Sequence, residues 1–231
     1  MVSSDILALK DNIIQAADLL IRSGVMSLSQ HGNISARLPG TDTFLLTAGG
    51  SLSNLTPENI ALFRLDGTLL EGAVEPTSAE IVDMHGIVFR LRADVGGVIH
   101  THSPYATSFA VAGQSIPLIY EAQARFNMID GVPVAGYAPR GSKESVDNIA
   151  GAIESYQNIG GVLLANHGVL AFAGDPVAAA RANIIIEETA ILALNARIIG
   201  DAKEIPSHMV GLTQQRRDSF AAAGIQRAGG S

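Results

Sequence analysis

The chain contains no cysteine and no tryptophan, and only 5% of its 231 residues are aromatic. Without cysteine it can form neither a disulfide framework nor a thiolate metal site, so any bound metal must have imidazole and oxygen ligands. Long apolar runs are also missing, because stretches such as "IIIEETAILAL" are interrupted by charge and too short to span a bilayer. The first residues, "MVSSDILALKDNII", lack the basic start and long apolar centre of a signal peptide. We therefore expect a soluble, cytoplasmic protein with no membrane partner.

Positive charge is scarce as well. Fifteen Lys and Arg stand against twenty-two Asp and Glu, for a net charge of −7, and no basic run occurs anywhere. Binding to a phosphate backbone requires such a basic surface, so nucleic acid is excluded as an expected partner. The 47% of hydrophobic residues suffice for a substantial core in one domain over residues 1–231. Residues 200–231, with "QQRR" and "AGGS", form a polar C-terminal tail with the composition of a mobile segment.

The apolar periodicity predicts helices towards both ends of the chain and mostly antiparallel strands between them. Helices are expected over residues 5–23, ended by Gly24, and from Asp175-Pro176 to about Ile199. The expected strands and turns are "NISARL" beside "TFLLTA", a hairpin at Asp66-Gly67, "GGVIHTH", and the two halves of "GVLLANHGVLAF". A further helix is expected within "EPTSAEIVDMHGIVFRLR".

Two of the six histidines, His100 and His102, lie two residues apart at the end of an apolar run. On a strand such residues project to the same face, which makes them a candidate pair of metal ligands, or else two polar residues at a strand end. His167 lies between Asn166 and Gly168 in a tight turn, which is either only a hairpin turn or a third ligand at a strand end. Three histidines are a common inner shell of catalytic zinc sites.

The other three histidines and Lys143 give no comparable indication of a metal or catalytic site. We interpret His85 as a histidine satisfied within its helix, and neither His31 nor His208 has a partner that the sequence identifies. Lys143, in the polar segment "RGSKES", is a poor candidate for a Schiff-base lysine.

Glu80 has two interpretations. Thr77 and Glu80 match a capping box, in which each side chain binds the other's backbone amide and no catalysis follows. The same segment, with Thr77 and Ser78, presents hydroxyls and free amides at a helix N-terminus, where a phosphate is stabilised. The glycine-containing segment from Thr47 to Gly50 is a second amide-rich candidate, although it matches neither a Walker loop nor G-x-G-x-x-G.

Six segments, taken in order, resemble the class II aldolase/adducin family over about residues 5–198. These segments are "HGNISARL", "LTAGG", "PTSAEIVDMH", "GGVIHTHSPYATSFA", "IPLIYEA" and "GVLLANHGVLAF". The resemblance implies a three-layer α/β/α fold with a central, mostly antiparallel sheet. It also implies a C4 homotetramer with a zinc site near the subunit interface.

Carried over by position, the resemblance makes His100, His102 and His167 the zinc ligands. It makes Glu80 a carboxylate that ligates the metal without substrate and acts as acid and base when substrate displaces it. Asn33 and Gly50, together with Thr77 and Ser78, would form the phosphate pocket.

The sequence departs from the family pattern at three places. The chain has Gly49-Gly50 where the aldolases usually show a Ser/Thr-Gly pair, which removes one hydroxyl from the phosphate pocket. Glu80 lies five residues before His85, whereas the family spacing is four. The tyrosine expected to donate a proton across the subunit interface is displaced by one, leaving Tyr120 as the candidate acid and Glu121 as its rival.

Three functions follow as hypotheses. The first is a metal-dependent aldolase with Zn²⁺, or else Mn²⁺ or Co²⁺. It would cleave a ketose phosphate or related hydroxy-ketone into dihydroxyacetone phosphate, or a similar donor, and an aldehyde through a metal-stabilised enediolate. The second is a decarboxylase, epimerase or dehydratase of the same family. The third, a non-catalytic binding module like the adducin head, is disfavoured by the retained histidines and Glu80.

Overall fold

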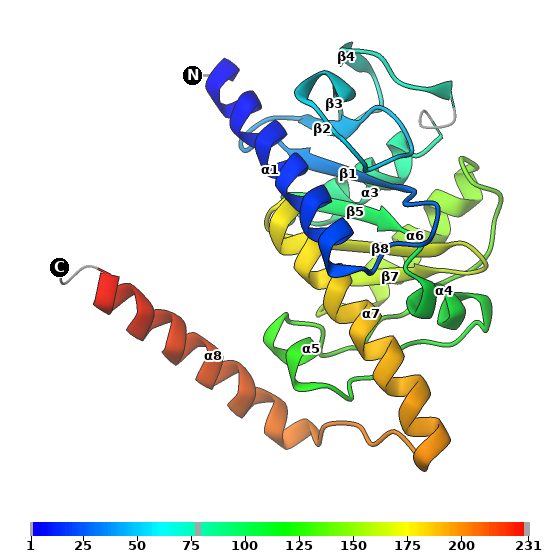
Figure 1. The fold of residues 1–231 in the computed structure, drawn as a ribbon, viewed down its shortest axis with the longest axis vertical. Helices are drawn as coiled ribbons and strands as arrows, with labels where there is room; N and C mark the ends of the chain where they lie inside the picture. Colours follow the sequence, from blue (N-terminus) through cyan, green and yellow to red (C-terminus); the bar gives the residue numbers. More distant parts are fainter. Residues whose placement is uncertain (1, 77–79, 229–231) are drawn as a thin grey trace.

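An eight-stranded sheet runs through the middle of the protein (Figure 1). The structure is a computed structural model, and it describes residues 2–76 and 80–228. The strands are β1 (Gly32–Arg37), β2 (Thr43–Thr47), β3 (Ile60–Arg64), β4 (Leu69–Glu71), β5 (Gly97–Thr101), β6 (Val134–Ala135), β7 (Gly161–Leu164) and β8 (Gly168–Ala173). Their order across the sheet is β4-β3-β2-β1-β5-β8-β7-β6, and only the β6–β7 pair is parallel. The expectation of a mostly antiparallel sheet is confirmed.

Helices cover both faces of this sheet. They are α1 (Val2–Ser23), the 3₁₀ turn η1 (Pro57–Asn59), α3 (Val82–Leu91), α4 (Pro104–Val111), α5 (Glu121–Arg125), α6 (Lys143–Ser155), α7 (Pro176–Ile199) and α8 (Ser207–Ala228). One apolar core joins α3 and α6 to strand residues that include Val98, and a second joins α1 and α7 to residues that include Ile99. Adjacent residues of β5 thus face opposite helical layers, as the alternation of a strand requires. The predicted three-layer α/β/α architecture is confirmed (Figure 1).

Local sequence signals account for several element boundaries. Gly24 ends α1 with a φ of +74°, and Gly67 turns the β3–β4 hairpin with a φ of +90°, both in the left-handed region that glycine tolerates. The Asp175 carboxylate accepts a hydrogen bond of 2.8 Å from the Ala178 amide and so caps the first turn of α7. The predicted start of α7 at Asp175-Pro176 is therefore confirmed.

The start of α3 differs from the prediction. The helix begins at Val82, and its N-cap residue Ile81 makes no side-chain cap. Thr77, the other half of the predicted capping box, lies outside the described residues together with Ser78. The Glu80 carboxylate accepts a hydrogen bond from the Arg140 side chain. The partner that the described residues show for this carboxylate is therefore 60 residues away, and the capping box with Thr77 stays a prediction.

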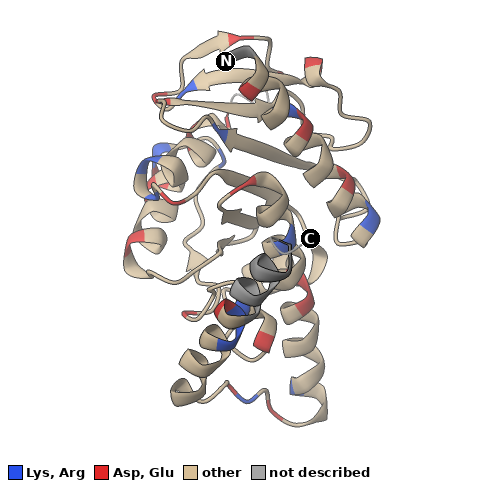
Figure 2. Cartoon of the chain, turned by 90° about the vertical axis from the view of Figure 1, so that its left-hand side faces the viewer, with Lys and Arg blue, Asp and Glu red and all other residues tan. Residues whose placement is uncertain are grey.

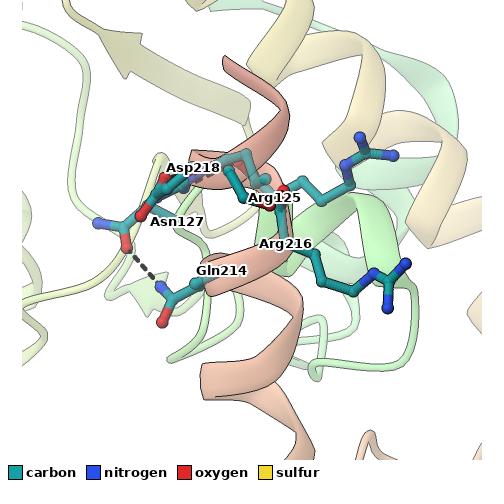
Figure 3. A network of polar contacts seen from close by, with 7 residues as sticks. Arg125, Asn127, Gln214, Arg216 and Asp218 are labelled. Carbon is teal, nitrogen blue, oxygen red and sulfur yellow. Dashed lines mark hydrogen bonds and ion pairs between the residues drawn. The ribbon is translucent and has the colours of Figure 1, made fainter. Parts of the chain in front are cut away.

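The segment after Gly200 contains helix α8, which extends from the body of the protein beyond α5 (Figure 1). Figure 3 shows the polar contacts that join the two helices. The Gln214 side chain donates to the Asn127 side chain at 3.1 Å, and Arg217 donates to the Arg125 carbonyl at 3.1 Å. A small apolar cluster that includes Val210 lies beneath them. The polar tail expected from composition thus has a helical structure fastened to α5.

Charged residues of both signs are scattered over the elements in Figure 2. This distribution is consistent with the absence of a basic run from the sequence. Over residues 2–76 and 80–228, the structure has no helix long and apolar enough to cross a bilayer.

Candidate metal centre

Three histidines, two of them at the end of β5 and the third about 65 residues further along the chain, meet at one end of the central strands. The ligand nitrogens of His100, His102 and His167 all lie within 4.8 Å of one another. Their ring centroids are separated by 4.6 to 5.2 Å. The structure therefore brings together the three residues that the sequence named as candidate ligands.

The antiparallel pairing of β5 with β8 explains this meeting. Thr101, the last residue of β5, pairs with Val169, next to the first residue of β8. His102 directly follows the end of β5, and His167 directly precedes the start of β8. Because the end of one antiparallel strand lies beside the start of its partner, these side chains converge.

A backbone contact sets the orientation of the His100 ring. Its Nδ1 lies 3.0 Å from the Val169 carbonyl oxygen, which can only accept, so Nδ1 must carry the proton. The other nitrogen, Nε2, then carries the lone pair and lies 3.2 Å from Nε2 of His102. A histidine with one nitrogen hydrogen-bonded to a carbonyl and the other free is the usual form of a metal ligand.

Gly168 provides the space for the rings. A Cβ at this position would lie 2.4 Å from the Thr101 carbonyl oxygen, 2.9 Å from the His102 ring and 3.1 Å from the His100 ring. The preceding turn uses Asn166, with a φ of +57°, a conformation that asparagine tolerates better than most residues. The "NHG" segment is therefore a tight turn and also a contributor to the cluster.

The surroundings of the three imidazoles favour their neutral form. Burial lowers the pKa of His100 well below its ordinary value, with smaller contributions from His167 and His102. Burial, followed by His102 and the positive charge of Arg140, lowers the pKa of His167 to about 4. The pKa of His102 is lowered by burial and then by His31 and Arg140. Because a metal ion binds only neutral imidazole, the three residues fit a divalent cation at neutral pH.

A buried polar network holds the segment that carries two of these histidines. The Thr101 hydroxyl donates to the Asn183 side-chain oxygen at 2.8 Å, and the Asn183 amide donates to the Ser103 hydroxyl at 3.0 Å. The two hydroxyls also lie 2.8 Å apart, and all three residues are buried. Since Thr101 and Ser103 flank His102, α7 fixes the backbone on both sides of this candidate ligand.

Glu187, one turn further along α7, holds the next segment. Its carboxylate accepts hydrogen bonds from the backbone amides of Tyr105 (2.9 Å) and Ala106 (2.7 Å), in the first turn of α4. Burial raises the pKa of Glu187, and the two backbone hydrogen bonds oppose that rise. Neither Asn183 nor Glu187 was predicted from the sequence. The sequence pointed to them only through their spacing, because they are polar residues four apart in the otherwise mostly apolar stretch "ANIIIEETA" and so lie on one face of a helix.

His85 lies in the core below the cluster. Its Nδ1 is 2.7 Å from the hydroxyl of Ser35 on β1, a partner outside its own helix, and Nε2 is buried and has no partner among the described residues. Full burial lowers the pKa of His85 from 6.5 to about 3. The ring is therefore neutral in the folded protein at every pH above that value.

This burial predicts a loss of stability in acid. Because the unfolded chain binds a proton near pH 6.5 and the folded chain does not, the contribution of His85 is complete above pH 6.5 and falls towards pH 3. Between about pH 7.5 and 5, wild type should lose about 2 kcal/mol more free energy of unfolding than His85→Gln, at 1.36 kcal/mol per pKa unit. Urea unfolding with a chelator present, which removes the pH dependence of metal binding, measures this difference. Equal losses in the two proteins would contradict the assignment.

The amide-rich segment lies beside the cluster. Asn33 pairs with His100 across the β1–β5 ladder, and its side-chain amide donates to the Gly49 carbonyl at 3.1 Å. The Gly50 carbonyl accepts from the Gly32 amide at 2.9 Å. The structure therefore places Asn33 and Gly50 near the candidate metal centre, whereas Thr77 and Ser78 lie outside the described residues.

Glu75 lies beside Gly49, the position at which this sequence departs from the family pattern. A Cβ at Gly49 would lie 2.9 Å from a carboxylate oxygen of Glu75. Where the aldolases usually carry a hydroxyl, this chain therefore has a negative charge. The Glu75 carboxylate makes the segment less favourable for an anion than the family pattern implies.

Two candidate catalytic residues lie outside the histidine cluster. Among the described residues, the Glu80 carboxylate is not one of the groups that meet within 4.8 Å, and it forms an ion pair of 2.9 Å with Arg140. Tyr120 precedes α5, and its backbone amide donates to the Gln123 side chain at 3.1 Å. Lys143 is the first residue of α6, not part of a loop, and pairs with Asp147 at 2.5 Å.

A cleft of about 720 Å³ opens beside His102. Its walls come from the start of α4 and from the connection after α1, and its lining residues include Ser27, Ser29, Thr107 and Ser108. The Thr107 hydroxyl is buried and has no partner among the described residues. A cleft of this volume can accommodate a small-molecule substrate next to the candidate ligands.

Comparison with known proteins agrees with this geometry. The model of the class II aldolase and adducin N-terminal domain family matches residues 11–194. The chain is 31% identical, over 85% of its length and 89% of the relative, to the 5-deoxy-D-ribulose 1-phosphate aldolase of Bacillus thuringiensis serovar kurstaki. It is 30% identical, over 70% of its length and 83% of the relative, to an L-fuculose phosphate aldolase of Methanococcus maripaludis.

A solved structure supports the same assignment. The L-fuculose 1-phosphate aldolase superposes with a TM-score of 0.81 at 26% identity, covering 90% of this chain and 95% of the other. The fold, the three converging histidines and the sequence similarity point to one conclusion. The chain belongs to the class II aldolase and adducin family, whose aldolases depend on a metal ion.

Proposed function

We propose that this protein is a metal-dependent aldolase. It would reversibly cleave a small ketose phosphate, or a related hydroxy-ketone, into dihydroxyacetone phosphate or a similar donor and an aldehyde. The observation that carries the proposal is the convergence of three buried or half-buried, neutral histidines beside a cleft. The sugar-phosphate aldolases among the relatives support this reaction class.

His100, His102 and His167 are the proposed ligands, with Zn²⁺ as the expected ion and Mn²⁺ or Co²⁺ as alternatives that imidazole also binds. A divalent cation bound there supplies Lewis acidity towards substrate oxygens, which contributes several kcal/mol to stabilising developing negative charge. The Val169 carbonyl keeps the His100 lone pair directed at the site, and the Asn183 network holds His102 in place. These contacts pre-organise the ligands before any ion binds.

Asn33 and Gly50, together with Thr77 and Ser78, are proposed to bind the phosphate. The position of Asn33 opposite His100 supports this role, because a short substrate can then contact both groups. The Glu75 carboxylate favours a second candidate at this point. By weakening phosphate binding at Gly49, it favours a reaction of the same family that does not place a phosphate there, by a decarboxylase, epimerase or dehydratase.

Glu80 is proposed as the base that removes the carbon-bound proton in the synthetic direction, and as the acid in the reverse direction. The Arg140 ion pair of 2.9 Å supports this role, because it holds the carboxylate in a defined position. Tyr120 is proposed as a weaker candidate acid that acts across the interface of a C4 homotetramer. Exposed apolar residues on α7 and α8, such as Ile199 and Leu212, support an assembly of this kind.

A substrate screen tests the proposal. Metal-loaded protein should form a new carbon–carbon bond between dihydroxyacetone phosphate and one or more small aldehydes. The same preparation is incubated with a panel of carboxylated hydroxy compounds. Turnover restricted to that panel would replace the aldolase by the second candidate, and turnover of neither class would contradict both.

The Glu80→Gln variant tests the proposed base. General acid–base catalysis contributes about 10²- to 10⁴-fold, so kcat should fall by roughly that factor. The metal content should stay at the wild-type level, because, in the part of the chain that the structure describes, the Glu80 carboxylate is not among the groups that meet within 4.8 Å, and the glutamine changes none of the three histidines. Exchange of the donor's carbon-bound proton with deuterated solvent, followed by nuclear magnetic resonance, isolates the step. Unchanged exchange in the variant would assign the base elsewhere.

A further inference from the structure

Arg140, which the sequence analysis did not select, lies at the same edge of the sheet as His167. Strands β6 and β7 are parallel, so their carboxyl ends lie side by side, and the Ala165 amide donates to the Ala135 carbonyl at 3.1 Å. His167 follows the end of β7, and Arg140 follows the end of β6. The segment 136–142 therefore runs beside the turn that carries His167.

One contact packs this segment against Glu80, and a second anchors its end at α6. Gly141 has a φ of +78°, and a Cβ there would lie 3.0 Å from Cβ of Glu80, so the backbone packs directly on that side chain. The Ser142 hydroxyl accepts a hydrogen bond of 3.1 Å from the Ser145 amide and caps α6, which anchors the end of the segment. Arg140 is therefore held at a defined place beside Glu80.

The guanidinium of Arg140 uses only one of its nitrogens in this arrangement. Nε donates to Glu80 Oε2 at 2.9 Å, and the side chain remains 45% exposed. Across the described residues, no hydrogen bond or ion pair engages its two terminal nitrogens. A planar guanidinium with two free terminal groups can bind a carboxylate or phosphate through two parallel hydrogen bonds.

The charge of Arg140 also reaches the histidine cluster. It contributes, after burial, to lowering the pKa of both His102 and His167. The opposite side of the cluster is less favourable for an anion, because the Glu75 carboxylate covers Gly49. Of the positions beside Arg140 and beside Gly49, the one beside Arg140 is the more favourable for a negatively charged group of a ligand.

We propose that Arg140 is a specificity-determining residue that binds an anionic group of the substrate through its terminal nitrogens while its Nε positions Glu80. The inference rests on the proposed function for the identity of the substrate, but not for the binding of the anion. The anionic group is a phosphate or a carboxylate, which share the geometry that a guanidinium recognises. Lysine cannot replace arginine here, because a single ammonium group cannot hold Glu80 and an anion in the same planar arrangement.

Calorimetric titration of the metal-loaded protein with inorganic phosphate and, separately, with glycolate tests the inference without turnover. Arg140→Met should weaken binding of at least one of these anions by about 10- to 100-fold, as expected for loss of a charge-assisted pair of hydrogen bonds. Arg140→Lys should restore only part of that loss. Arg22→Met is the matched control, because Arg22 is also an exposed arginine in an ion pair, with Asp18 on α1.

The two probes identify the chemical class. Dependence of phosphate binding on Arg140 assigns a phosphorylated group to this position, and dependence of glycolate binding assigns a carboxylate. An Asn33→Ala variant distinguishes phosphate binding at Asn33 from phosphate binding at Arg140. In this variant, the loss of phosphate affinity caused by Arg140→Met should be the same as in wild type. If both anions bind Arg140→Met as tightly as wild type, the inference is overturned, whatever reaction the enzyme performs.

Kinetics and unfolding distinguish recognition from a merely structural ion pair. With an active substrate, Arg140→Met should raise KM for anionic substrates more than for their uncharged analogues. The thermal unfolding midpoint should stay near that of wild type, since exposed ion pairs contribute little stability. Equal kinetic losses for charged and uncharged substrates would overturn the recognition role. Anion binding that depends on Arg140 in a protein without aldolase turnover would instead contradict the proposed function alone.

Discussion

Replacing His100 by alanine is expected to abolish metal binding and to lower the aldolase turnover by about 10³-fold or more. The Lewis acid is expected to contribute several kcal/mol, and each 1.36 kcal/mol corresponds to a factor of ten in rate. Two imidazoles alone leave a site with too few ligands for tight binding of Zn²⁺. Elemental analysis of the purified protein and kcat measured with saturating metal check the two effects together.

Two further variants separate ligand loss from damage to the core. His100 is buried, so its removal also leaves a cavity, whereas His102 and His167 are half-buried. His102→Ala and His167→Ala should reproduce the loss of metal with a smaller change in stability. His208→Ala, at an exposed position on α8, serves as the control and should keep wild-type metal content. Full metal occupancy in all three cluster variants would refute the site.

The substitution Asn183→Ala should lower both the free energy of unfolding and the affinity for the metal. Removing the amide leaves the Thr101 and Ser103 hydroxyls with only each other as partners, in a fully buried position. Unsatisfied buried polar groups and the new cavity together should lower the free energy of unfolding by about 2 to 4 kcal/mol. Because Thr101 and Ser103 flank His102, metal affinity should also fall by about 10- to 100-fold, as for other residues that orient ligands.

Chemical unfolding of metal-free protein and competition with a metal indicator measure these effects separately. Asn195→Ala is the matched control, since it makes the same substitution at an exposed position of the same helix. It should change the free energy of unfolding by no more than about 0.5 kcal/mol. A stability loss without any change in metal affinity would reduce the network to a structural role.

Features governed by neighbouring residues could be predicted from the sequence. The pairing of β1 with β2, the turn at Gly67 and the cap at Asp175 depend on side chains within a few positions, and each is confirmed. The convergence of the three histidines was also foreseen. It follows from strand alternation at His100 and His102, and from the place of His167 between two strands.

Contacts between distant segments could not be predicted in this way. Local spacing gave Glu80 a capping box with Thr77, which lies outside the described residues, but it gave no sign of the ion pair with Arg140, 60 residues away. Asn183 lies 82 residues from Thr101, and the apolar stretch around it gave no sign of a polar partner. Gly49 was recognised as a departure, but the Glu75 carboxylate over it was not.

By itself, the sequence determined the helices, the mostly antiparallel strands and the candidate ligands. The elements follow from the period of apolar residues, and the common face of His100 and His102 follows from their position on a strand. The three-layer class of the fold and the choice of the three histidines as ligands followed from the resemblance to the family. The tertiary structure alone decided which groups surround those ligands: Asn183 and Glu187 beneath them, Glu75 on one side and Arg140 on the other. Such partners depend on the packing of helices and strand ends that are remote in the chain, and no spacing along the chain encodes those distances.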